Sequence, residues 1–250
     1  MIPVAKGHLF IIGAQRSATT QLAQQLESHP NISMAVPNKP EPKWFLDQSR
    51  SRDIESYLRT YFPEDTTQLW LGEKSTSYLE MPEAAERISV NIANPQIFVV
   101  LRDPTERAIS NFYYSVMNGV ETRSVEEALS LKGIDSSPHW TKETFSVSPY
   151  AYLERGLYFR LLAPWLDIFG EDLHVLMFED VIRGCGGEQV ASCLNLVDFE
   201  FDTLTTPVNS APRSGPQPTS DLRQRLNEFF KAPNRELADA FGLNISHWSS

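Results

Sequence analysis

Three short apolar runs constrain the fold of this chain more than any other feature. They lie at 8–12 (HLFII), 96–101 (QIFVVL) and 173–178 (LHVLMF). Uninterrupted runs of this length are typical of strands that are buried on both faces, as in parallel sheets. Weaker apolar patterns predict two further strands, at 32–36 and 69–74.

Segments with helical periodicity alternate with these strands, and this order favours helices packed on a mostly parallel sheet. We therefore expect an α/β fold, a three-layer P-loop-like sandwich with a central mostly parallel sheet flanked by helices. At 250 residues, one domain covering 1–250 is expected. Pro164 is expected to bend or end the helix that contains it. The predicted helices are 19–28, 82–91, 104–117, 125–131, 150–169, 189–196 and 221–230.

The formal net charge of −10 weighs against several kinds of partner. Proteins that bind nucleic acids rely on Lys and Arg side chains at phosphates, so a nucleic-acid partner is not expected. A strongly polyanionic acceptor is disfavoured for the same electrostatic reason. The two cysteines, Cys185 and Cys193, have no neighbours at metal-ligand spacing, so no metal site is predicted.

The apolar run Leu9–Ile12 is far too short for a signal peptide or a membrane span. A cytoplasmic protein without a membrane partner is the expectation that follows.

The segment between the first predicted strand and the first predicted helix has the character of an anion-binding loop. Backbone N–H groups converge at a helix N-terminus, and the helix dipole favours negative charge there. Arg16 would add a full positive charge, and two threonine hydroxyls would add hydrogen-bond donors. The Walker lysine is absent, so this is not a Walker A loop. The alternative is an ordinary capped helix after a strand. The residues of this loop are Gly13, Ala14, Gln15, Arg16, Ser17, Ala18, Thr19 and Thr20.

A second group of polar residues follows the 96–101 strand. Arg102 leaves the strand end, and Ser110 lies two turns into the next helix. At the carboxyl edge of an α/β sheet, side chains placed in this way can reach one bound ligand. Arg107, on the same helix, is expected at the helix surface or paired with Asp103.

Taken together, the two segments resemble the PAPS-dependent sulfotransferase family, where PAPS is 3′-phosphoadenosine 5′-phosphosulfate. The resemblance is closer to its heparan-sulfate-type branch and its bacterial carbohydrate or small-molecule branch than to its phenol and steroid branch. The 13–20 loop is similar to the family's 5′-phosphosulfate loop, Gly-x-x-Lys/Arg-x-Gly-Thr-Thr. Arg102 and Ser110 match the family's 3′-phosphate element.

Three further segments carry the resemblance. Residues 39–45 (KPEPKWF) resemble the segment with the catalytic glutamate, which falls on Glu41. Residues 72–78 (GEKSTSY) resemble the Glu-Lys-Thr-Pro-x-Tyr stretch, with its functional lysine at Lys74. The C-terminal residues 222–244 are similar to the family's closing helices, including a turn at 233–237. Arg213 lies in a loop where related enzymes place basic contacts to the cofactor.

The resemblance implies an enzyme that moves a sulfuryl group from PAPS to a hydroxyl or amine of a small-molecule or sugar-containing acceptor. In this scheme Glu41 is the general base, and Arg16 and Lys74 stabilise the charge on the leaving phosphate oxygen. Arg102 and Ser110 hold the 3′-phosphate, and no metal is required. Oligomeric state does not follow from the sequence.

One departure keeps alternatives open. The family has glycine where this chain has Ala18, and if the position needs a positive φ, alanine is unfavourable there by about 1 kcal/mol. The alternative functions are a P-loop kinase-like phosphotransferase and a non-catalytic nucleotide-binding module of the same fold. For Glu41 and Lys74 the alternatives are a solvated turn carboxylate and a surface charge at a strand end.

Overall fold

The predicted strands form one sheet in the computed structural model of this protein, which describes residues 7–62, 67–131, 140–141, 145–196, 199–201 and 215–248. The chain divides into two compact units, one built from 1–101 and 164–209, the other from 102–163 and 210–250. The expectation of one domain stays a prediction.

The first unit contains a five-stranded sheet in the order β2-β3-β1-β4-β5, and all its neighbouring strands are parallel. This arrangement confirms the predicted central parallel sheet. The second strand ends two residues early because the Val36 N–H bonds to the carbonyl of Tyr61 at 2.8 Å. The strands are β1 (Gly7–Gly13), β2 (Ile32–Met34), β3 (Trp70–Lys74), β4 (Gln96–Leu101) and β5 (Leu173–Met177).

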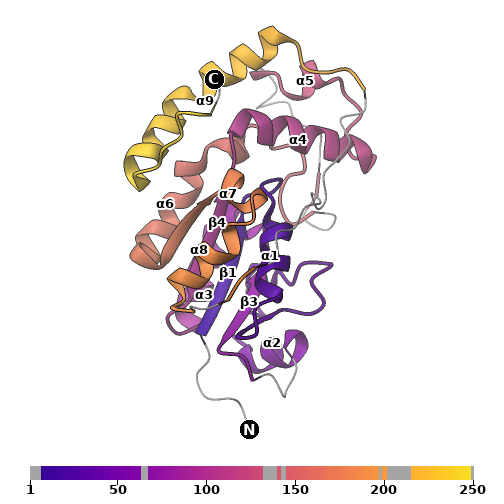
Figure 1. Ribbon diagram of the computed structural model, residues 1–250. Helices are drawn as coiled ribbons and strands as arrows, with labels where there is room; N and C mark the ends of the chain where they lie inside the picture. The colour runs from indigo at the N-terminus through magenta and orange to yellow at the C-terminus, as the bar shows by residue number, and fades with distance from the viewer. Residues whose placement is uncertain are drawn as a thin grey trace. The chain divides into compact units, whose positions relative to one another are not determined.

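Helices cover both faces of this sheet, which confirms the three layers (Figure 1). One face packs Leu9, Ile11, Phe98 and Val100 against α1, α7 and α8 in a buried core. On the opposite face, Phe10 meets an aromatic cluster, its ring 5.7 Å from that of Phe45, and α3 packs on the short helices η1 and η2. The helical elements of this unit are α1 (Thr19–Glu27), η1 (Trp44–Leu46), α2 (Ile54–Tyr61), η2 (Tyr78–Glu80), α3 (Pro82–Asn91), η5 (Gly170–Asp172), α7 (Phe178–Ile182) and α8 (Gly186–Cys193).

The second unit is helical. A separate core joins α4, α5 and α9, with Ile109, Phe112, Leu226 and Phe230 among its buried residues. Helix α6 begins in this unit and ends in the first. The elements are α4 (Pro104–Met117), α5 (Val125–Ala128), η4 (Glu154–Gly156), α6 (Tyr158–Phe169) and α9 (Ser220–Phe241).

Several predicted helix ends were wrong, chiefly where proline was expected to act. Helix α9 continues through Pro233, so the predicted turn at 233–237 lies inside a helix. Helix α6 likewise continues through Pro164. In both helices the residues beyond the proline still bury apolar surface, since Trp165 and Leu237 are 0% exposed. That burial offsets the backbone hydrogen bond that each proline removes.

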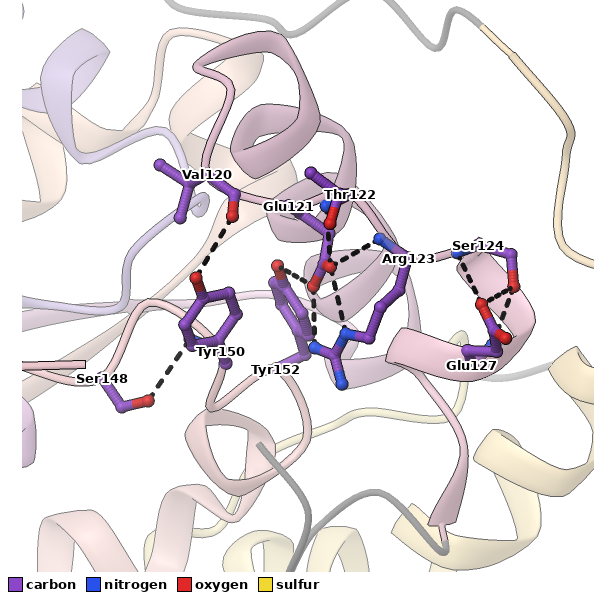
Figure 2. A network of polar contacts seen from close by, with 9 residues as sticks. All are labelled: Val120, Glu121, Thr122, Arg123, Ser124, Glu127, Ser148, Tyr150 and Tyr152. Carbon is purple, nitrogen blue, oxygen red and sulfur yellow. Dashed lines mark hydrogen bonds and ion pairs between the residues drawn. The ribbon is translucent and has the colours of Figure 1, made fainter. Parts of the chain in front are cut away.

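A network of polar contacts joins two segments of the second unit (Figure 2). The buried carboxylate of Glu121 accepts from the Arg123 guanidinium, Nε at 3.0 Å and the terminal nitrogen at 2.7 Å, and from the Tyr152 hydroxyl at 3.0 Å. Burial raises the pKa of Glu121, but hydrogen bonds from Arg123 and Tyr152 outweigh that effect, and the net shift is downward. Nearby, Ser124 and Glu127 form a capping box that begins α5.

The expectation that Arg107 lies at the helix surface was wrong, because the residue is 0% exposed. Its guanidinium donates to the backbone carbonyl of Tyr152 and to Asn111 Oδ1. The Asp103 carboxylate caps α4 by accepting from the Thr105 N–H at 2.8 Å and the Glu106 N–H at 3.2 Å. Pairing of Arg107 with Asp103 stays a prediction. The prediction of a surface position failed because α4 is buried on more than one side, so a charged residue on it need not face solvent.

Candidate active site

The loop at 13–20 joins the end of β1 to the start of α1, as predicted. Its first turn is tied to the sheet, because the Ala14 N–H donates to the Val100 carbonyl at 2.9 Å. Gly13 passes close to η2, and a Cβ there would lie 2.9 Å from Leu79. The loop therefore opens directly onto a helix N-terminus, where backbone N–H groups favour a bound anion.

Two residues of the loop have left-handed backbone conformations. Arg16 has a φ of 70° and Ala18 a φ of 60°. Ala18 is the N-cap of α1, and the helix has no side-chain cap there. The position thus meets the condition under which glycine, the residue that the family resemblance places there, is favoured over alanine.

Ser17 is the clearest sign that this loop is built around a ligand. The residue is 0% exposed, and its Oγ has no hydrogen-bond partner among the described residues. Buried hydroxyl groups in native proteins are almost always hydrogen-bonded. A phosphate or sulfate oxygen at the helix N-terminus would satisfy this hydroxyl, so the loop fits the anionic end of PAPS.

Glu41 and Lys74, 33 residues apart in sequence, meet at the end of β3. Lys74 Nζ lies 2.6 Å from Glu41 Oε1. Thr76 completes the arrangement: its N–H donates to Glu41 Oε2 at 3.0 Å and its hydroxyl to Oε1 at 3.0 Å. The Glu41 carboxylate is therefore held in one orientation by a single segment, at the end of β3, that lies 33 to 35 residues further along the chain.

A second carboxylate, Glu73, immediately precedes Lys74 on β3 and was not singled out by the sequence analysis. It is 0% exposed and accepts from the Tyr57 hydroxyl at 2.8 Å and from Ser75 Oγ at 2.6 Å. Burial raises the pKa of Glu73, while hydrogen bonds from Ser75, Tyr78 and Tyr57 act in the opposite direction without cancelling the rise. A carboxylate inside an otherwise apolar strand is the signal that would have identified it.

The segment that carries Glu41 is held by side chains from two helices, α2 and α3. Arg87 on α3 donates to the carbonyls of Phe45 at 2.9 Å and Leu46 at 3.0 Å. The Tyr61 hydroxyl on α2 donates to the Pro42 carbonyl at 3.4 Å. Backbone groups that would otherwise be open to water are thus bonded to the protein.

The remaining predicted site residues belong to the second unit. Arg102 follows β4 directly, and its carbonyl accepts from the Tyr158 hydroxyl at 2.8 Å. Ser110 lies on α4 and is partly exposed. Their roles at the 3′-phosphate stay a prediction. Arg213 lies outside the described residues.

A parallel sheet with a glycine-started loop and a helix N-terminus at its carboxyl edge is the arrangement at which many α/β proteins hold phosphorylated ligands. Comparison with known proteins gives the family. The sulfotransferase domain family matches residues 6–188, and the chain belongs to that family.

Three known proteins illustrate the similarity. The chain is 28% identical over 204 residues to a bifunctional heparan sulfate N-deacetylase/N-sulfotransferase 1 of Caenorhabditis briggsae, covering 78% of this chain and 23% of that protein. It is 31% identical over 159 residues to heparan sulfate glucosamine 3-O-sulfotransferase 3B1 of Mus musculus, covering 64% of this chain and 37% of that protein. The crystal structure of a sulfotransferase from Alicyclobacillus acidocaldarius shares the fold, with a TM-score of 0.78, 24% identity, and coverage of 99% of this chain and 100% of that one.

Membrane-spanning helices and metal-binding clusters are both absent from the part of the chain that the structure describes. No helix in that part of the chain has both the length and the apolar character needed to cross a membrane. Among the same residues, no group of three or more His, Cys, Asp or Glu side chains is placed to hold a metal ion.

Proposed function

We propose that this protein transfers a sulfuryl group from PAPS to a hydroxyl or amine of a small-molecule or sugar-containing acceptor. The observation that carries the proposal is the 2.6 Å contact between Glu41 and Lys74. The family resemblance assigns both residues to the reaction, although they are 33 residues apart in the sequence. Family membership supports the same chemistry.

The roles follow from what sulfuryl transfer requires. The acceptor oxygen or nitrogen forms a bond to sulfur, and the bond between sulfur and the 5′-phosphate oxygen breaks. A neutral alcohol is a weak nucleophile, and Glu41, held by Thr76, is the group proposed to take its proton. Lys74 and Arg16 are proposed to stabilise the negative charge that grows on the phosphate oxygen.

PAPS supplies an activated phosphosulfate, and the residues proposed to hold it are those of the 13–20 loop with Arg102, Ser110 and Arg213. Ser17 supports this assignment, because its buried hydroxyl would gain a partner from an anion at the start of α1. The scheme uses no metal.

The acceptor class is the least constrained part of the proposal. The names of the two relatives above specify N-sulfation in one and 3-O-sulfation of glucosamine in the other. Both are sugar acceptors, which supports a sugar-containing molecule here. The formal charge of −10 favours a small acceptor over a long polyanionic glycan. Cytoplasmic localisation stays a prediction.

A sulfation screen tests the proposal. The protein is incubated with PAPS and separate panels of alcohols, amines, phenols and sugars, and products are detected by mass spectrometry. A mass gain of one sulfate on one acceptor class, with release of adenosine 3′,5′-bisphosphate, is the expected result. Tight binding of Mg–ATP with no binding of adenosine 3′,5′-bisphosphate would instead support the kinase-like alternative.

Glu41→Gln separates a catalytic protein from a binding module. We expect the variant to lose about 100-fold or more in kcat, the range for general-base catalysis, since amide oxygen is a very weak base. Binding of adenosine 3′,5′-bisphosphate, measured by calorimetry, should change little.

The matched control is Glu86→Gln, a change of the same kind at an exposed position on α3, which should retain the parental rate. If Glu41→Gln turns over at the parental rate, Glu41 is not the base.

A further inference from the structure

The buried carboxylate of Glu73 contacts three hydroxyl groups. Ser75 Oγ donates to Oε1 at 2.6 Å and the Tyr57 hydroxyl to Oε2 at 2.8 Å. The Tyr78 hydroxyl is close enough to this carboxylate to lower the pKa of Glu73. Glu73 itself lies one residue before Lys74 on β3, in register with Phe10 of β1. It therefore belongs to the sheet of the first unit.

Two of these hydroxyls also accept a hydrogen bond from a backbone N–H. Ser75 Oγ accepts the Lys43 N–H at 2.9 Å, and the Tyr78 hydroxyl accepts the Phe45 N–H at 3.0 Å. A hydroxyl has one proton to donate, and an ionised carboxylate only accepts. Glu73 thus draws the Ser75 proton toward itself, and its negative charge favours the same direction for the Tyr78 proton. Both hydroxyl oxygens are then left to accept from the backbone.

Lys43 and Phe45 follow Glu41 closely in the chain, so their backbone positions govern where the Glu41 carboxylate can lie. Lys43 also has a left-handed backbone, with a φ of 50°. Such a conformation persists only where surrounding contacts determine it. The two N–H bonds are contacts of that kind.

We propose that Glu73 is a positioning residue that directs the hydroxyl protons of Ser75 and Tyr78, and thereby fixes the 43–45 backbone that presents Glu41 to Lys74. The expected effect on catalysis rests on the proposed function. The positioning itself can be measured by amide hydrogen exchange, which needs no enzyme activity. Glu73 takes no part in proton transfer in this scheme.

Glu73→Gln is the direct test because it keeps the shape and replaces an acceptor oxygen with an N–H₂ donor. A hydroxyl that receives this new donor must turn its own proton elsewhere and loses its place as acceptor for the backbone. We expect hydrogen exchange of the Lys43 or Phe45 amide to become about 10-fold faster or more. We also expect kcat to fall about 10- to 100-fold, because small misplacement of a catalytic group has large effects. The Kd for adenosine 3′,5′-bisphosphate should stay within about twofold, since the base is not a cofactor contact in this scheme.

A pair of tyrosine variants provides the matched control and a second route if Glu73→Gln does not fold. Tyr78→Phe and Tyr57→Phe each remove one hydroxyl from Glu73, but only the first removes an acceptor for the Phe45 N–H. Phenylalanine retains the ring packing of Tyr57 on Phe45, 5.4 Å between centroids. We expect Tyr78→Phe to show faster Phe45 exchange and a lower kcat, and Tyr57→Phe to keep kcat within about threefold of the parent.

The outcomes separate the two proposals. If the parent protein transfers no sulfuryl group and exchange is still faster in Tyr78→Phe and Glu73→Gln, the proposed function fails and the positioning role is supported. Unchanged amide exchange in both variants overturns the positioning role, whatever the activity. Equal losses of kcat and Tm in Tyr57→Phe and Tyr78→Phe also overturn it, because the network would then act only through stability.

Discussion

At the scale of single residues, Ala18 departs most clearly from the conformation that its residue type prefers. Its φ of 60° and ψ of 20° lie in the left-handed region, at the N-cap of α1. Ala18→Gly should raise the free energy of unfolding by about 0.5–1 kcal/mol, because relief of the strain exceeds the added chain entropy of the unfolded state. Chemical denaturation of the two proteins measures this difference.

Ala23→Gly is the control for that change. Ala23 lies inside the same helix and is buried, so glycine there should lower the free energy of unfolding by about 1 kcal/mol. Equal losses in the two variants would show that Ala18 is not strained.

The residue scale also shows where sequence reasoning succeeded and where it stopped. Glu41 and Lys74 were predicted from their separate motifs, and the structure brings them to 2.6 Å. Glu73, adjacent to Lys74 in sequence, was missed. Its importance comes from Tyr57, Ser75 and Tyr78 converging on it, and sequence order does not show which hydroxyls a buried carboxylate will meet.

At the scale of elements, the polar network around Glu121 holds the turn after α4 to the segment before η4 (Figure 2). Glu121→Gln should lower the free energy of unfolding by about 2–3 kcal/mol at pH 7, since charged hydrogen bonds from Arg123 are lost in a buried setting. Thermal and urea denaturation of the parent and the variant measure this loss.

The loss of stability in Glu121→Gln should depend on pH. The pKa of Glu121 is below its ordinary value near 4.5 in the folded protein. Its stabilising contribution is therefore complete above that ordinary pKa and is lost as the pH falls through the lowered folded pKa. The difference between parent and Glu121→Gln should shrink below about pH 4.

Glu127→Gln is the matched control, because Glu127 is exposed and its role in the capping box is one that glutamine can share. Its expected loss of stability is much smaller than that of Glu121→Gln, both at pH 7 and below about pH 4. A Glu121→Gln loss no larger than this would contradict the stabilising role of the network.

Element types were predicted better than element ends. Continuous apolar runs identified β1, β4 and β5, since only strands buried on both faces need them. The α2 and α7 helices were not predicted; each is short, at 8 and 5 residues, and too little of the helical period is present to stand out. Pro233 was expected in a turn and lies within α9, because tertiary burial of Leu237 outweighs the local preference of proline.

At the scale of the whole molecule, ligand binding should raise the free energy of unfolding. Adenosine 3′,5′-bisphosphate at about 100 times its Kd is expected to add about 2.7 kcal/mol and to raise Tm by about 5–10 °C. Differential scanning fluorimetry measures the shift, and Mg–ATP at the same concentration serves as the comparison. An equal or larger shift with Mg–ATP, and none with the bisphosphate, would argue against a PAPS enzyme.

The sequence by itself determined the α/β class, the loop after the first strand and the residue types that sulfuryl transfer needs. These are local features, readable from apolar runs and from motifs of adjacent residues. Only the tertiary structure decided that Ala18 is left-handed, that Ser17 Oγ is buried without a partner among the described residues, and that the buried Glu73 carboxylate accepts from Tyr57 and Ser75. The physical reason is that burial, backbone strain and hydrogen-bond partners depend on segments distant in sequence, and folding alone brings those segments together.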